Sequence, residues 1–203
     1  MKVAIRLLAM ILLLAAGAVR AADAPEFAID QVLGNAAAPV TIIEYASLTC
    51  PHCAHFHETT LPKLRAEWID TGKVKMIYRD FPTAPSDLSI GAGMIAHCAG
   101  KDRYFGVLGL LFKAQGKWAT SNEPLTDIKQ AVRLAGMTGE QVDACLQKQD
   151  LWDAIVARAN AATKTYGIDG TPTLIIDGKM VSGGESYETI SRLIQEAARK
   201  AKK

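Results

Sequence analysis

Apolar runs separated by polar turns predict a small set of strands in this chain. A mixed stretch near residues 27–33 predicts one short strand. Asp177 and Gly178 stand between two apolar runs, and this dipeptide in that setting is a strong signal for a two-residue hairpin. The apolar runs that predict the other strands lie at residues 40–45, 74–78, 173–176 and 179–181.

Apolar residues spaced three and four apart predict helices in the remaining segments. The first helix follows residue 50, ends near Thr71 and Gly72, and is interrupted by Pro62, where we expect a kink. A closing helix begins at Tyr187, and its apolar residues share one face. The chain between these parts is helical in pattern. The helices expected there lie near residues 87–99, 103–114, 124–135, 139–147 and 151–164.

The order of these elements predicts the fold class. A strand–helix–strand unit comes first, a helical block follows, and two strands and a helix close the chain. This is the order of the thioredoxin fold with an inserted helical domain, which is an α/β architecture. We expect the thioredoxin part to comprise residues 22–85 and 167–203, and the inserted helical domain to comprise residues 86–166.

The first 21 residues have the pattern of a cleavable signal peptide. Lys2 and Arg6 form a basic start, an apolar run follows at residues 7–19, and Ala21 ends a cleavage site. The apolar run is shorter than the ~20 residues of a membrane-spanning helix, so an uncleaved anchor is the weaker alternative. Cleavage removes Lys2, Arg6 and Arg20, which changes the formal net charge from +2 to −1. That charge does not indicate nucleic-acid binding.

Two cysteines in the pattern C-x-x-C stand where the strand at 40–45 leads into a helix. They belong to the tetrad Cys50-Pro51-His52-Cys53. Unpaired N–H groups at a helix N-terminus favour a thiolate over a thiol, and a thiolate is the species that attacks a disulfide. The tetrad therefore indicates redox chemistry. The chain has four cysteines, and an even number in an exported protein fits two disulfides, for which the sequence allows three pairings.

Four stretches together resemble the DsbA-like thiol:disulfide oxidoreductases of the thioredoxin superfamily. They are Glu44, the tetrad at 50–53, Tyr78-Arg79-Asp80-Phe81-Pro82 and Gly170-Thr171-Pro172-Thr173. The resemblance covers nearly all of the chain after the signal peptide. It implies a thioredoxin fold with a helical insertion, a location in the periplasm, and formation of disulfides in exported proteins.

The resemblance also implies roles for the cysteines of the tetrad. Cys50 matches the nucleophile, and the helix start, local N–H donors and the neighbouring His52 should lower its thiol pKa. Pro51 and His52 complete the catalytic tetrad. Cys53 matches the resolving cysteine, which should be shielded one helical turn further in.

Further site residues follow from the same resemblance. Pro172 matches a cis-proline, and Thr171, preceded by Gly170, would offer its backbone N–H and C=O to an extended substrate. The alternative is an ordinary proline at the start of an edge strand. Glu44 matches a buried acidic residue that could carry protons to or from Cys53. The alternative is that Glu44 faces solvent.

A second pair of cysteines lies in the helical block. Some members of the family carry a second disulfide in the insertion, and the positions of Cys98 and Cys145 fit it. The resemblance therefore implies a structural disulfide between them. The alternative is two separate buried thiols that act as small hydrophobic groups.

Three histidines near the tetrad leave a second class of function open. His52, His55 and His57 could form a soft-metal site for copper or zinc, but no second C-x-x-C completes one. We therefore expect no metal. We interpret His55 and His57 as polar surface, and His97 as a helix residue without a special role.

Other thioredoxin-like functions are alternatives too. An isomerase or reductase is the nearest rival, because related isomerases also carry threonine at the position of Thr171. Isomerases of this group usually dimerise through an added N-terminal domain, and the chain between Ala21 and residue 33 is too short for one. A non-catalytic binding module is a further alternative, which the intact C-x-x-C disfavours. We therefore expect a monomeric oxidase.

The expected partners follow from the resemblance. They are reduced, cysteine-containing exported proteins and a quinone-linked membrane oxidase, similar to DsbB, that accepts the electrons. We expect no bound cofactor and no nucleic acid.

Overall fold

A five-stranded mixed sheet forms the centre of the protein in a computed structural model, which describes residues 30–201. The strand order is β1-β3-β2-β4-β5, with β2 and β3 parallel and the other neighbours antiparallel. The predicted signal peptide lies outside the described residues. The strands are β1 (Gln31–Leu33), β2 (Val40–Ala46), β3 (Val74–Asp80), β4 (Thr173–Ile176) and β5 (Lys179–Ser182).

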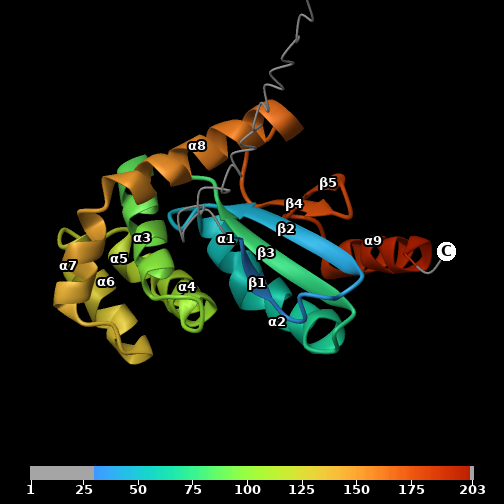
Figure 1. Cartoon of the computed structure of the whole chain (residues 1–203), viewed down its shortest axis with the longest axis horizontal. Helices are drawn as coiled ribbons and strands as arrows, with labels where there is room; N and C mark the ends of the chain where they lie inside the picture. Colours follow the sequence, from blue (N-terminus) through green and yellow to red (C-terminus); the bar gives the residue numbers. More distant parts are fainter. Residues whose placement is uncertain (1–29, 202–203) are drawn as a thin grey trace, which may run out of the picture.

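Helices cover both faces of this sheet (Figure 1). On β2, Val40 and Ile42 face the helix that follows the tetrad and the closing helix α9 (Tyr187–Lys200), where they share a core with Ile190 and Ile194. Tyr45 and Ile175 face the opposite side, where the end of α8 (Gln149–Tyr166) covers them. Side chains alternate between the two faces along a strand, and helices cover both faces of β2. Its sequence is therefore a nearly continuous apolar run.

The helix that begins within the tetrad extends from Pro51 to Ile69 and changes its hydrogen bonding along its length. Its segments are α1 (Pro51–His55), η2 (Phe56–Thr60), α2 (Leu61–Leu64) and η3 (Arg65–Ile69), of which η2 and η3 are π-helical. Pro62 has no N–H for the helical ladder, and π segments on either side accommodate it. The structure thus shows a change of hydrogen bonding on both sides of Pro62, whereas we expected a kink there, and neither π segment was predicted.

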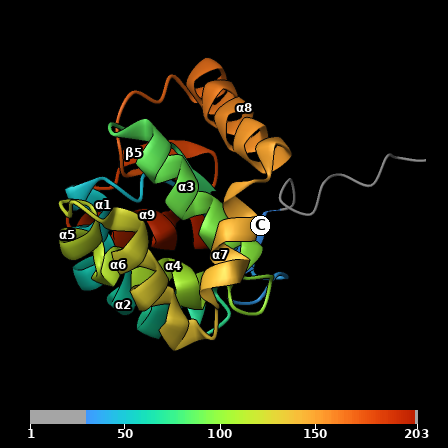
Figure 2. The ribbon, with the colours of Figure 1, turned by 90° about the vertical axis from the view of Figure 1, so that its left-hand side faces the viewer.

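The block between β3 and β4 is helical over residues 86–166 (Figure 1). Seen from its own side, α5 lies beside α1 (Figure 2). The sequence did not predict α5 as a separate element, because it is a single turn directly after α4. The helices of the block are α3 (Ser86–Cys98), α4 (Tyr104–Lys113), α5 (Gln115–Trp118), α6 (Pro124–Val132), the short η4 (Arg133–Ala135), α7 (Gly139–Leu146) and α8.

Local signals in the sequence fix several element ends. Thr138 and Gln141 form a reciprocal capping box at the start of α7. The turn between β4 and β5 has positive φ at both Asp177 (48°) and Gly178 (83°), as a type I′ hairpin requires. These ends are therefore set by nearby residues rather than by distant packing.

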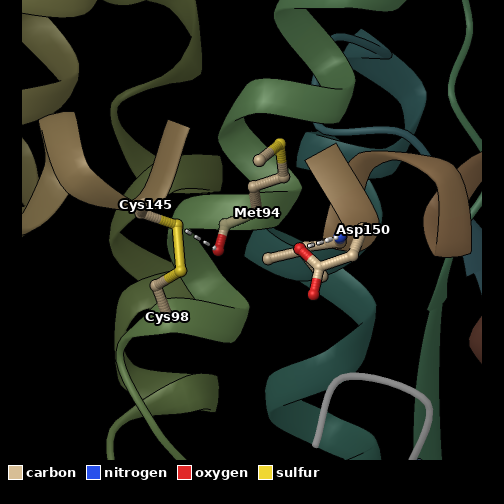
Figure 3. Close-up of a disulfide and its surroundings, with 5 residues drawn as sticks. Met94, Cys98, Cys145 and Asp150 are labelled. Atoms are coloured by element: carbon tan, nitrogen blue, oxygen red, sulfur yellow. Dashed lines mark hydrogen bonds between the residues drawn. A yellow bond between two sulfur atoms is a disulfide. The ribbon is translucent and has the colours of Figure 1, made fainter. Parts of the chain in front are cut away.

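Cys98 at the end of α3 and Cys145 in α7 form a disulfide (Figure 3). The bond joins two helices of the insertion that are 47 residues apart in sequence. The Cys145 sulfur lies 3.1 Å from the Met94 carbonyl oxygen, and the pair is packed with Ile90. The disulfide therefore belongs to the core of the helical block and lies apart from the C-x-x-C.

Candidate active site

The two cysteines of the tetrad differ in exposure because they occupy different positions on α1. Cys50 is the N-cap residue, with extended backbone (φ −82°, ψ 119°), and its side chain is half-buried. Pro51 follows at the first helical position, where its missing N–H and fixed φ suit a helix start. Cys53 lies one turn inside and is 0% exposed. Both carry free thiols in this structure.

The surroundings of Cys50 lower its thiol pKa to about 5, from an ordinary value of 9.0. Hydrogen bonding from the Cys53 thiol is the largest cause. Partial burial opposes it, and hydrogen bonding at Thr171 and from the backbone N–H groups of Cys53 and His52 adds to it. His52 is exposed, and its contribution here comes from its backbone rather than its ring.

Cys53 is shifted in the opposite direction. Burial raises the pKa of its thiol most, and its hydrogen bond to Cys50 and the charge of Glu44 raise it further. The helix thus places a sulfur that ionises readily beside a sulfur that keeps its proton.

The loop before β4 lies against the Cys50 sulfur. The Thr171–Pro172 peptide bond is cis, and Cys50 Sγ lies 3.4 Å from the Thr171 carbonyl oxygen. The Gly170 carbonyl oxygen accepts a hydrogen bond from Thr173 Oγ1 at 2.7 Å. A Cβ at Gly183 would stand 2.6 Å from the Pro172 ring, so the chain can close over the proline only with glycine there.

An open cavity of about 330 Å³ continues from this loop toward the edge strand β5. Residues 168–173 line one side of it, and Met180 lines the other with its side chain about half exposed. The cavity therefore offers an apolar side chain and backbone groups beside the Thr171 loop, whose carbonyl oxygen lies 3.4 Å from the Cys50 sulfur.

Glu44 is fully buried and pairs with His57. The His57 Nε2 atom lies 3.1 Å from Glu44 Oε1 and 3.0 Å from Oε2, and its ring stacks on Phe112 with centroids 3.9 Å apart. Our interpretation of His57 as polar surface is therefore wrong, and so is the alternative that Glu44 faces solvent. The helical period held the signal, because His57 follows buried Cys53 by four residues and shares its face.

His97 also departs from the expectation of a residue without a special role. Its Nε2 atom lies 2.8 Å from Asp80 Oδ2, and both side chains are almost completely buried between β3 and α3. A Cβ at Gly93 would stand 2.4 Å from Asp80 Oδ1, so glycine there leaves room for the pair. His97 therefore joins the thioredoxin part to the insertion.

Gln115 is a residue near the site that sequence reasoning missed. Its Nε2 atom donates to the carbonyl oxygens of Leu48 and Cys50, at 2.8 and 2.9 Å. It comes from α5, 65 residues after Cys50, and no local pattern of the sequence connects the two.

The described part of the chain contains neither a cluster of metal-binding side chains nor a membrane-spanning helix. Within residues 30–201, no three His, Cys, Asp or Glu side chains group so that they could hold a metal ion. In that same part of the chain, no helix combines the length and apolar character needed to cross a membrane.

Known proteins resemble this chain along most of its length. The family described as "Thioredoxin" matches residues 28–196. A putative protein-disulfide oxidoreductase of Rickettsia bellii is 36% identical over 177 residues, which cover 85% of this chain and 66% of that protein. The chain thus spans just under two thirds of that relative's length. A probable disulfide bond formation protein D of Bacillus cereus is 26% identical over 180 residues, covering 86% of this chain and 81% of its own.

A solved structure shares the fold. The crystal structure of alpha-DsbA1 from Wolbachia pipientis matches with a TM-score of 0.77 at 30% identity, covering 85% of this chain and 92% of that one. Because the match covers 85% of this chain, it includes both the sheet and the helical block.

Proposed function

The chain belongs to the thioredoxin family and is DsbA-like, and on that premise we propose that it donates the Cys50–Cys53 disulfide to reduced proteins. The observation that carries the proposal is the contrast between the two thiols, since the pKa of Cys50 is about 5 while that of Cys53 is raised. A stabilised thiolate favours the reduced pair, so the oxidised pair readily gives its disulfide away.

The reaction has two exchange steps. A substrate thiolate attacks the Cys50 sulfur of the oxidised pair, the bond between the two cysteines breaks, and Cys53 leaves with the electron pair. A second substrate thiolate then attacks the substrate sulfur of the mixed disulfide, and Cys50 leaves as a thiolate. The substrate loses two electrons and gains a disulfide, and the cysteine pair takes both electrons.

Cys53 needs a proton when it leaves, because burial makes its thiolate unfavourable. We take Glu44 as the group that delivers that proton. In support, its charge raises the pKa of this thiol, and His57 holds its carboxyl. This extends the role expected for Glu44, with His57 as its partner.

Substrate binding at the cis-proline loop follows from the same arrangement. The Thr171 carbonyl oxygen is close to the Cys50 sulfur, so an extended peptide that pairs with Thr171 would bring its own cysteine to that sulfur. Met180 would contact an apolar residue of that peptide.

The location and the partners extend this proposal. The signal-peptide pattern of residues 1–21 supports export to the periplasm, where exported proteins would be the substrates. The reduced pair would pass its electrons to a quinone-linked membrane oxidase of the DsbB type. The names of the relatives in Rickettsia and Bacillus are consistent with disulfide formation.

The experiment is the reduction potential of the pair, measured against glutathione, together with refolding of a reduced and of a scrambled disulfide protein. An oxidase should have a reduction potential of about −120 mV, the value of the DsbA oxidant, and should act on the reduced protein. A reduction potential of about −270 mV, with reduction of a test disulfide, would indicate a reductase instead. Preferential rescue of the scrambled protein would indicate an isomerase.

A further inference from the structure

Gln115 forms a polar contact between the helical insertion and the loop that carries the tetrad. The side chain is 5% exposed, and its Nε2 atom donates to the carbonyl oxygens of Leu48 and Cys50. A primary amide has two N–H groups, and here each has an acceptor. Because both acceptors are carbonyl oxygens, only the nitrogen end of the amide can face them, which fixes its orientation.

The packing and hydrogen bonds of α5 hold the Gln115 amide in place. Trp118, at the other end of α5, is fully buried, and its Nε1 atom donates to the Leu111 carbonyl oxygen at 2.8 Å. The Gln115 backbone carbonyl accepts from the Ala119 N–H at 2.9 Å. The position of the amide is therefore set by the packing of the insertion.

The Cys50 carbonyl is also part of the helix start. It accepts from the N–H groups of Cys53 and Ala54, at 3.1 and 3.2 Å, while the Cys50 N–H donates to the Ser47 carbonyl oxygen at 3.1 Å. The N–H groups of His52 and Cys53 that lower the thiol pKa belong to this same turn. Any movement of the Cys50 carbonyl therefore changes how the sulfur meets its donors.

We propose that Gln115 is a positioning residue for the redox pair: its amide, supplied by the insertion, holds the Cys50 backbone so that the sulfur stays over the donors of α1. The inference rests on the proposed function and extends it to the insertion. Loss of the amide should disfavour the thiolate, because the sulfur then meets the N–H donors of α1 in poorer geometry.

The test compares Gln115→Leu and Gln115→Glu with the unchanged chain. The ultraviolet absorbance of the Cys50 thiolate is followed against pH, and the equilibrium of the pair with glutathione is measured. For Gln115→Leu we expect the titration midpoint of Cys50 to rise by about one pH unit. The equilibrium constant for oxidation of glutathione by the Cys50–Cys53 disulfide should fall about tenfold, which lowers the reduction potential of the pair by about 30 mV. Gln115→Glu should give a larger rise, because it places a carboxylate against two carbonyl oxygens.

Gln130→Leu is the matched control. Gln130 lies in α6 of the same insertion and is exposed, and its side chain accepts from Lys117 of α5 without reaching the tetrad loop. In the Gln130→Leu variant, the titration midpoint of the Cys50 thiolate should equal that of the unchanged chain.

The outcomes separate this inference from the proposed function. A folded Gln115→Leu or Gln115→Glu variant with an unchanged midpoint and equilibrium constant would overturn the positioning role. Failure of both variants to fold, judged by near-ultraviolet circular dichroism, would also overturn it, because Gln115 would then serve the fold alone. A reductase-like potential in the unchanged chain would overturn the oxidase function and leave the comparison between variants valid.

Discussion

The thiolate of Cys50 should make the stability of the reduced protein depend on pH, while the oxidised protein lacks this contribution. The perturbation is a change of pH from 8 to 5 on both forms. In the reduced native state the pKa of Cys50 is about 5, against 9.0 for an ordinary thiol in the unfolded chain. Between these values the unfolded chain binds one more proton than the native protein, so stability rises with pH in this window. The contribution is lost as pH falls through 5.

The magnitude follows from the size of the shift. At pH 7 the native thiol is ionised and the unfolded thiol is not, which corresponds to about 2.7 kcal/mol at about 1.36 kcal/mol per pH unit. Cys50 is half-buried, and solvent screens part of the interaction, so we expect about 1–2 kcal/mol at pH 7 and little at pH 5.

The assay is guanidinium unfolding of the oxidised and reduced proteins at several pH values. The oxidised form serves as the reference, because the two forms differ in their titrating groups only by the thiols of Cys50 and Cys53. Burial raises the pKa of the Cys53 thiol, so it stays protonated over this pH range and adds almost nothing to the difference. The difference between the two free energies of unfolding should shift in favour of the reduced form by about 1–2 kcal/mol between pH 5 and pH 7. Cys50→Ala has no thiolate here and should follow the pH profile of the oxidised protein. A difference that stays constant from pH 5 to pH 8 would refute the reasoning.

Three further changes test other contacts. Glu44→Gln should slow release of the mixed disulfide by roughly 100-fold in single-turnover kinetics, because it removes the proton donor, whereas exposed Glu58→Gln should not; equal rates would remove the role. His57→Leu leaves a buried carboxyl without its partner and should lower the free energy of unfolding by about 3 kcal/mol, with partial recovery when Glu44→Gln is added; additive losses would contradict the pairing. Replacing Cys98 and Cys145 by alanine should cost about 4 kcal/mol in the same assay, since a 47-residue loop is no longer closed in the unfolded chain; an unchanged unfolding midpoint would argue against that contribution.

Much of the fold was predictable because its signals are local. The Asp177-Gly178 turn requires a conformation that few other residue pairs adopt, and the β2 run is apolar because the strand is buried on both faces. The tetrad could be placed at a helix start for the same reason, since Pro51 suits the first position of a helix.

The errors concern side chains whose partners are remote. We interpreted His57 as polar surface and His97 as a helix residue without a special role, but a carboxyl from another element pairs with each of them in the interior. The helical period places His57 on the face of buried Cys53, but nothing along the chain shows which carboxyl either histidine meets. The environment of each histidine is decided by which face of the helix meets which strand.

The sequence alone determined the order of the strands and of the longer helices, and the chemistry expected of the tetrad, because these depend on residues a few positions apart. Only the tertiary structure decided that Glu44 meets His57, that Thr171 lies against Cys50, and that Gln115 reaches the tetrad loop. These contacts join separate elements, and their geometry depends on how the core packs, which local periodicity does not encode. The residues around the reactive sulfur therefore come from distant parts of the chain, although the sulfur itself was evident from its motif.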